Sequence, residues 1–286
     1  MPKVDQFESA FRAASKTVFE YQPIAVKSIL VITDRSKKEA DVFGKQTADF
    51  LSVLRSDGSP RWRIVNGSEF ETVPELLALV EEERPDLICT YRHLHSESWK
   101  WPYTLGEYVD VLAQVTTTPV MVLPHPDAMR ASEHAVKDTL IVMAMTDHLT
   151  GDAVLVNYAA RFTEPSGTLF LTHVEDDATF ERYMGTISRI PSIDTENARR
   201  TILEQLLKEP KDYIRSCREV LEAEGLPLAV EAIVTKGHHL HEFEKLVEKH
   251  EVDLLVFNTK DEDQLAMHGL AYPLAVELRQ IPLLLL

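Results

Sequence analysis

The chain has 286 residues, 44% of them hydrophobic and 27% charged, which suits two globular domains that each bury a core. Its formal net charge of −16 disfavours nucleic acid and anionic membranes as partners, because the field repels polyanions. No apolar run is long enough to span a bilayer, and residues 1–11 lack the apolar stretch of a signal peptide. The two cysteines, Cys89 and Cys217, fall within apolar patterns and indicate buried free thiols. We therefore expect a cytoplasmic protein.

The first predicted element, within residues 1–24, is an amphipathic helix over residues 5–21, which Pro23 ends. Its apolar face carries Phe7, Phe11, Ala14, Val18 and Tyr21. That face is too apolar to remain in water. We expect it to cover the sheet of the first half of the chain, or the equivalent region of a partner subunit.

Residues 25–123 predict an abbreviated α/β domain with about four parallel strands. Thr72 and Glu75 have the spacing of a capping box and place a helix start there. The predicted strands are 28–34, 62–65, 86–90 and 119–123, with helices at 38–56, from Thr72, and from Gly106.

The proline-containing stretch 124–137 is predicted as a linker, and residues 138–286 as a complete α/β domain. Its predicted strands are 139–145, 168–174, 228–234, 253–258 and a closing strand at 282–286. Helices are expected at 151–162, 197–224 and 240–250 and before the closing strand, with an irregular stretch after residue 174. Pro210 is expected to kink the long helix.

The two halves repeat their openings and their closings. Both first strands end in Thr-Asp, and in both halves a glycine lies 13 residues before the proline that precedes the last strand. The interval between the two Asp is 113 residues and that between the two Pro is 163, so the second repeat is longer by 50 residues. This excess is enough for one more strand–helix crossover. The sequence therefore predicts two tandem doubly wound parallel-sheet domains, with the two apolar closing strands paired.

This set of features resembles the universal stress protein family. The residues that carry the resemblance are Thr33-Asp34, Thr146-Asp147, Leu171–Val174, Asp253–Asn258 and the two glycine-to-proline intervals. The resemblance implies a Rossmann-like five-stranded parallel sheet, a frequent tandem arrangement, and pairing through the last strand. It therefore implies a homodimer, or a pseudo-dimer of the chain's own two domains, with regulatory partners that the sequence does not name.

ATP-binding members of this family carry Gly-x2-Gly after the fourth strand and Gly-Ser or Gly-Thr nine residues later. Here only the last glycine of each motif is present, as Gly106 and Gly269, and neither 91–98 nor 258–265 contains glycine. Without these glycines, side chains occupy the space of the phosphate cradle. We therefore expect no ATP to be retained, with ATP or AMP in the second domain as the alternative. The nucleotide-site equivalents are Asp147, Val174, Gly269, Asp34 and Gly106.

Each candidate residue also has a purely structural explanation. The two strand-end aspartates can cap a turn instead of facing adenine. The loop 91–103 contains Arg92, His93, His95 and Lys100 among aromatic residues, which indicates a pocket for a small anionic or aromatic ligand. The pattern favours the alternative, a packed aromatic lid or a contact with the other half. The tract His238, His239 and His241 favours a solvated loop over a metal site, because no zinc-ligand spacing accompanies it.

No nucleophile–base pattern of a known enzyme class stands out. We expect a non-enzymatic stress-response protein that acts through dimerisation or partner binding. An adenine-nucleotide sensor is the second hypothesis. A third is an enzyme of another doubly wound family, such as an electron-transfer flavoprotein or a nucleotide-α-hydrolase relative.

Overall fold

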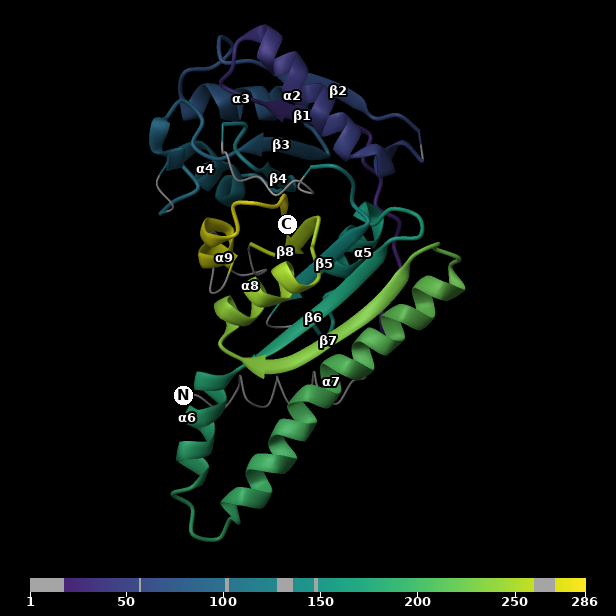
Figure 1. The fold of residues 1–286 in the computed structure, drawn as a ribbon, viewed down its shortest axis with the longest axis vertical. Coiled ribbons are helices and arrows are strands. Elements are labelled where there is room, and N and C mark those ends of the chain that lie inside the picture. Colours follow the sequence, from purple (N-terminus) through teal and green to yellow (C-terminus); the bar gives the residue numbers. More distant parts are fainter. Residues whose placement is uncertain (1–17, 57, 101–102, 128–135, 147–148, 260–270) are drawn as a thin grey trace.

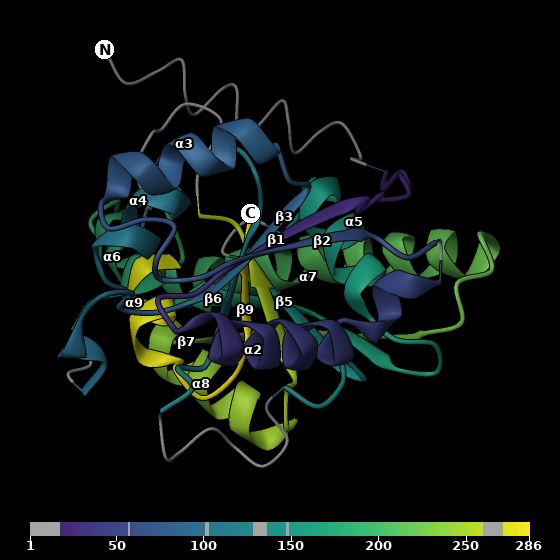
Figure 2. The ribbon, with the colours of Figure 1, turned by 90° about the horizontal axis from the view of Figure 1, so that it is seen from above.

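The computed structural model describes residues 18–56, 58–100, 103–127, 136–146, 149–259 and 271–286. Nine strands form one sheet in the order β2-β1-β3-β4-β9-β8-β5-β6-β7 (Figure 1). Every neighbouring pair is parallel except β4 and β9, which are antiparallel. Helices cover both faces, as in the first half, where α3 and α2 lie on opposite sides of the strands (Figure 2). The prediction of a doubly wound α/β fold is confirmed.

The first half contributes four strands, as the sequence predicts. Its apolar strands are buried on both faces, which is typical of parallel sheets. The elements are β1 (Ser28–Ile32), α2 (Lys37–Phe50), η1 (Ser52–Arg55), β2 (Arg61–Val65), α3 (Val73–Glu83), β3 (Leu87–Tyr91), η2 (Glu97–Lys100), α4 (Glu107–Val115) and β4 (Val120–Leu123). The predicted capping box is present, since the Thr72 side chain accepts from the Glu75 N–H and the Glu75 carboxylate accepts from the Thr72 N–H.

The second half contributes five strands. Its elements are β5 (Ile141–Thr146), α5 (Ala153–Phe162), β6 (Thr168–Asp176), α6 (Asp177–Ile187), α7 (Thr195–Ala223), β7 (Ala229–Gly237), α8 (His239–Lys249), β8 (Leu254–Phe257), α9 (Ala271–Glu277) and β9 (Leu283–Leu285). The prediction of an irregular stretch after residue 174 is wrong, because Asp176 caps a helix there by accepting from the Thr179 N–H. With α7 this helix forms a hairpin that extends beyond the sheet (Figure 1).

None of the described helices is both long and apolar enough to cross a membrane.

The closing strands β4 and β9 pair in the middle of the sheet. Val120 faces Leu285, Met121 faces Leu284, and Val122 faces Leu283. All six side chains are buried, so two apolar edges cover each other.

An arginine from each half binds main-chain carbonyls of the other half. Arg92, at the end of β3, donates to the carbonyls of Val276 and Leu278 at 3.0 and 2.7 Å, at the end of α9. Burial lowers the pKa of Arg92 to about 9. Arg161 of α5 donates in turn to the carbonyls of Val53 and Leu54 in η1, at 3.1 and 3.3 Å. The two guanidinium groups thus donate to carbonyls at helix ends, which have few partners within their own helices.

The described part of the N-terminal segment lies on the second half. Residues 18–24 form no helix, so the predicted helix does not extend to Tyr21, and residues 1–17 lie outside the described residues. Phe19 is buried, and its ring lies 6.5 Å from that of Tyr213 in α7. The expectation that this segment covers the first half does not hold for residues 18–24, because Asn157 of α5 bonds their backbone instead.

We predict that Leu284→Asp destabilises both halves together. The substitution places an unpaired carboxylate opposite Met121, which should cost about 3 kcal/mol or more. All three tryptophans lie in the first half, at positions 62, 99 and 101, so their fluorescence in urea reports unfolding of that half. The fluorescence transition should move to lower urea together with the circular dichroism transition. An unmoved fluorescence transition would show that the halves unfold separately, and Leu284→Ile is the control.

A second prediction concerns Asp110 of α4, which shares a side-chain hydrogen bond with Tyr272 of α9. Burial raises the pKa of Asp110 to about 6, and this hydrogen bond opposes the rise. Because the folded state favours the protonated carboxyl, the free energy of unfolding falls as pH rises from about 4 to 6. Asp110→Asn should therefore stabilise the protein at pH 7 by about 1–2 kcal/mol and have little effect at pH 4.

The measurement is the urea midpoint of Asp110→Asn minus that of the natural chain, at both pH values. The exposed Asp41→Asn is the matched control. Equal differences at pH 4 and pH 7 would refute the assignment to Asp110.

Candidate functional site

Doubly wound sheets bind ligands at the carboxyl ends of their strands, where the strand order reverses. In the first half this point lies between β1 and β3, and in the second between β5 and β8. The predicted residue Asp34 lies two positions after the end of β1, and Arg92 directly follows β3. The sequence predicted this position for Asp34, whereas it assigned Arg92 only to a possible ligand-binding loop.

Tyr91 fills the centre of the first site. Its hydroxyl lies 2.7 Å from the Thr33 hydroxyl and donates to the Asp34 carboxylate. The Tyr91 side chain is fully buried, and its burial, together with this carboxylate, raises its pKa. The second Asp34 oxygen accepts from the His95 N–H at 2.8 Å. Both carboxylate oxygens of Asp34 thus bind groups of the protein itself.

The loop after β3 packs closely against the start of α4. His93 and His95 have positive φ angles of 61° and 54°, and the His93 N–H donates to the Leu105 carbonyl at 3.0 Å. Gly106 caps α4 with φ 91°, and a Cβ there would lie 2.8 Å from the His93 backbone. The single glycine retained from the phosphate motif therefore has a packing role, because it allows this loop to approach the helix.

Aromatic and imidazole rings surround Tyr91. The His125 ring lies 5.0 Å from the Tyr91 ring, and the Phe43 ring lies 5.2 Å from it at 90°. Burial lowers the pKa of His125 to about 4, and its Nδ1 accepts from the Asp127 N–H. His125 is consequently neutral at pH 7 and offers no positive charge to a phosphate.

Three of the four members of the predicted small-ligand loop are placed, His93 as described above, and the fourth is placed in part. The guanidinium of Arg92 is buried and bonded to α9, as described above. The His95 ring lies 4.8 Å from the Phe70 ring and 5.6 Å from that of Tyr108. The backbone of Lys100 lies in η2. The contacts of Arg92 and His95 agree with a packed lid that also touches the other half.

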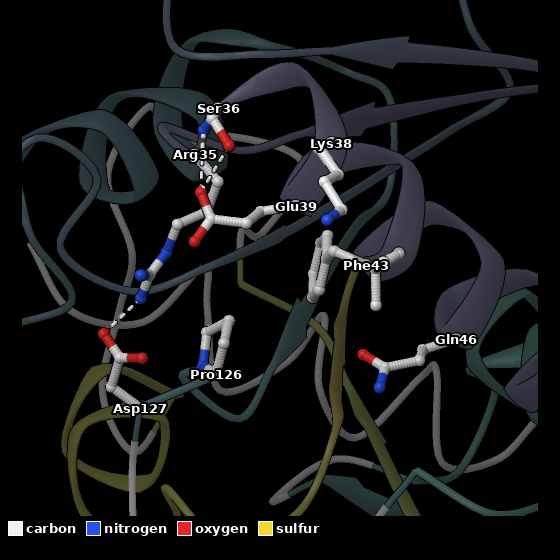
Figure 3. A pocket seen from close by; sticks show the side chains of 9 residues that line it. Arg35, Ser36, Lys38, Glu39, Phe43, Gln46, Pro126 and Asp127 are labelled. Carbon is white, nitrogen blue, oxygen red and sulfur yellow. Dashed lines mark hydrogen bonds and ion pairs between the residues drawn. The ribbon is translucent and has the colours of Figure 1, made fainter.

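A groove of about 500 Å³ opens beside this site, between α2 and the residues after β4. Figure 3 shows Arg35 reaching across it to the Asp127 carboxylate, with Phe43 and Pro126 along its wall. Lys38 and Glu39 also line it, so the positive and negative side chains balance. Sequence reasoning missed this groove. The available signal was the capping-box spacing of Ser36 and Glu39, which marks the start of α2 at the edge of the groove.

The second site is described only in part. Asp147 and Gly269 lie outside the described residues. The Val174 carbonyl is 2.6 Å from Nε2 of His239, which belongs to α8. The histidine tract was expected to be a solvated loop, but it starts a helix, and the His239 ring stacks on Phe243 at 6.0 Å.

Polar atoms are buried within β6 of this second half, at the level where β5 ends. Within the described part of the chain, the Thr172 hydroxyl and both ring nitrogens of His173 have no hydrogen-bond partner. The Glu175 carboxylate lies 3.5 Å from Nε2 of His173, and His173 sits beside Thr146 in the sheet register. Buried polar groups of this kind commonly bind water or a ligand.

No protein-family model matches the chain, and no curated protein matches it. Solved structures resemble it over nine-tenths of its length. One is a universal stress protein from Archaeoglobus fulgidus DSM 4304, with 11% identity, a TM-score of 0.49, and coverage of 90% of this chain and 95% of that one. Another is the functionally unknown protein PA1789 from Pseudomonas aeruginosa PAO1, with 13% identity, a TM-score of 0.48, and 92% of each chain covered. The first of these carries the family name that the sequence motifs suggested.

We predict that Tyr91→Phe destabilises the protein by about 1–3 kcal/mol in urea unfolding, since Thr33 and Asp34 lose a buried partner. Tyr108→Phe is the matched control. Among the described residues, the Tyr108 hydroxyl makes a single hydrogen bond, to the Glu71 carbonyl at 2.7 Å, and this bond is only partly buried. Equal losses for the two variants would contradict a central role for the Tyr91 network.

Proposed function

We propose that the chain is a universal stress protein-like protein that acts by binding partners, with no nucleotide in its first half. The observation that carries this proposal is the Tyr91 hydroxyl bonded to Thr33 and Asp34 at the point where the strand order reverses. A ligand that binds there would have to displace the buried Tyr91 phenol and leave the Asp34 carboxylate without its donors. The free-energy cost of losing these buried hydrogen bonds is larger than it would be at a solvent-exposed site.

The charges around the first site support the same proposal. The Arg35 guanidinium is paired with Asp127, and that hydrogen bond raises the pKa of Arg35. His125 is neutral, and Arg92 is bonded to carbonyls. In a chain of net charge −16 these paired cations leave little attraction for a triphosphate.

The two thiols are poor candidates for catalysis, which supports a non-enzymatic role. Both cysteines are free and buried. Burial raises the pKa of Cys89, and it raises that of Cys217 to about 12, so neither forms the reactive thiolate at neutral pH. Free thiols also fit a reducing compartment, and we propose the cytoplasm.

The pairing of β4 with β9 supports a pseudo-dimer made within one chain. It occupies the closing strands through which the resembled family pairs. We propose that partners, including any second copy of the chain, bind elsewhere. Sedimentation of the purified protein tests this, since a dimer that Leu284→Asp dissociates while the variant keeps the circular dichroism spectrum of the natural chain would place the closing strands between copies.

A second candidate is an adenine-nucleotide sensor that uses the second half. The buried polar atoms of Thr172 and His173 favour it, because they lie near the carboxyl edge without hydrogen-bond partners among the described residues. This candidate concerns a different site and does not depend on Tyr91.

Calorimetry with ATP and with AMP, in magnesium at neutral pH, distinguishes the two candidates. The proposal predicts no binding at micromolar concentrations. Micromolar binding that persists in Tyr91→Phe and disappears in His173→Phe would overturn it in favour of the second candidate. Native mass spectrometry of freshly purified protein is the independent check, since a retained nucleotide would add its mass to the chain.

A further inference from the structure

The end of the α6–α7 hairpin presents apolar side chains to solvent. We call residues 182–194, which join α6 to α7, the hairpin tip. Tyr183, Ile190 and Ile193 of this tip are 59%, 44% and 39% exposed. Backbone hydrogen bonds order the turn, since the Ile190 N–H donates to the Ile187 carbonyl at 2.9 Å and the Ile193 N–H to the Ile190 carbonyl at 3.1 Å. Apolar side chains that are grouped on an ordered surface commonly mark a site of protein–protein contact.

The hairpin tip is also positively charged, in a chain whose net charge is −16. Its carboxylate, Asp194, caps α7 by accepting from the Asn197 N–H at 3.1 Å. Its two arginines, Arg182 and Arg189, make no ion pair with any residue that the structure describes, and the Arg182 guanidinium lies 5.8 Å from the centre of the Tyr183 ring. Free guanidinium groups beside exposed apolar side chains complement a surface that is apolar and acidic.

A surface of that kind lies between α8 and the chain after α9. This α8–α9 groove has a volume of about 500 Å³, and its apolar lining includes Val247 and Ile281. Four glutamates and one arginine also line it, and the glutamates are Glu244, Glu248, Glu251 and Glu277. Among the described residues, none of these four carboxylates has an ion pair or a hydrogen bond. The groove therefore carries an excess of negative charge, whereas the charges along the groove beside Arg35 balance.

The hairpin tip cannot reach the groove of its own chain. The hairpin leaves the sheet at the carboxyl edge of the second half, because α6 starts directly after β6. The groove lies at the amino edge, because α8 ends just before β8 starts. Figure 1 shows the hairpin extending away from α8 and α9. The two surfaces can therefore meet only when they belong to different copies of the chain.

We propose that the hairpin tip of one copy binds the α8–α9 groove of a second copy, with Ile190 and Ile193 against the apolar lining and Arg189 facing the glutamates. A second copy is the occupant because the two surfaces of this chain complement each other in polarity and in charge. The contact leaves β4 and β9 paired within each chain. Because the tip and the groove are different surfaces, the copies associate head to tail. This inference rests on the proposed partner-binding function and names one partner.

Sedimentation of the full chain at low salt tests the contact. The natural chain should associate reversibly at about 10–100 μM, because one tip in one groove is a small interface. Arg189→Glu should weaken the association at least about tenfold, since it places a carboxylate against the glutamates. Lys45→Glu on the exposed surface of α2 changes the net charge equally and should have no effect. A natural chain that stays monomeric, or equal weakening by the two variants, would overturn the proposal.

Mixing two variants gives a sharper test. Arg189→Glu has a reversed tip and a natural groove, whereas Glu248→Arg/Glu277→Arg has a natural tip and a reversed groove. Neither variant should associate alone, but an equimolar mixture should, because the natural tip of one meets the natural groove of the other. Recovery in the mixture also shows that both variants are folded. A mixture that stays monomeric, or a groove variant that associates alone, would overturn the proposal.

The failure of this inference is distinguishable from the failure of the proposed function. A monomeric natural chain would overturn the head-to-tail contact and leave the proposed function unaffected. Micromolar nucleotide binding in calorimetry would overturn the proposed function without changing the sedimentation of the charge-reversed variants.

Discussion

The antiparallel pairing of β4 with β9 is the contact on which the rest of the molecule depends. Each half ends in an apolar strand, and an open strand of that kind pairs with whatever edge is available. Here the available edge belongs to the same chain, so two parallel sheets become one sheet of nine strands. Arg92 and Arg161 reinforce the join from opposite sides, because each guanidinium satisfies carbonyls at a helix end of the other half.

This pairing also separates the two candidate sites. Since the strands of one half run antiparallel to those of the other, the carboxyl edges of the halves face opposite ends of the sheet. A ligand at one site cannot contact the other directly. The halves are therefore free to differ, and the first has its site filled by Tyr91 and the rings around it.

The halves differ most in what lies beyond the shared core. The second half has one more strand and the α6–α7 hairpin, and the chain before β1 crosses onto that half. Asn157 and Arg161 hold this crossing segment through its main chain, which makes it a third connection between the halves. The longer half therefore supports an N-terminal segment that its shorter counterpart, which lacks the long helix, does not.

The sequence by itself determined the local elements and their class. Apolar runs that end in Thr-Asp specified buried parallel strands, Thr72 and Glu75 specified a helix start, and the excess of 50 residues specified an extra crossover. These features depend on residues that are close together in the chain, so their periodicity and spacing can be recognised from the sequence alone. The irregular stretch after residue 174 was misread because Asp176 supplies its cap from the end of a strand.

Only the tertiary structure decided what the site residues do. Asp34, Gly106 and Arg92 were found from motifs, but their partners Tyr91, His93 and Val276 lie between 13 and 184 residues away in the chain. The groove between Arg35 and Asp127 likewise joins residues 92 positions apart. Such contacts follow from strand order and loop packing, which no local sequence pattern encodes. Gly106, which suggested a phosphate site, therefore serves instead to let the loop after β3 pack against α4.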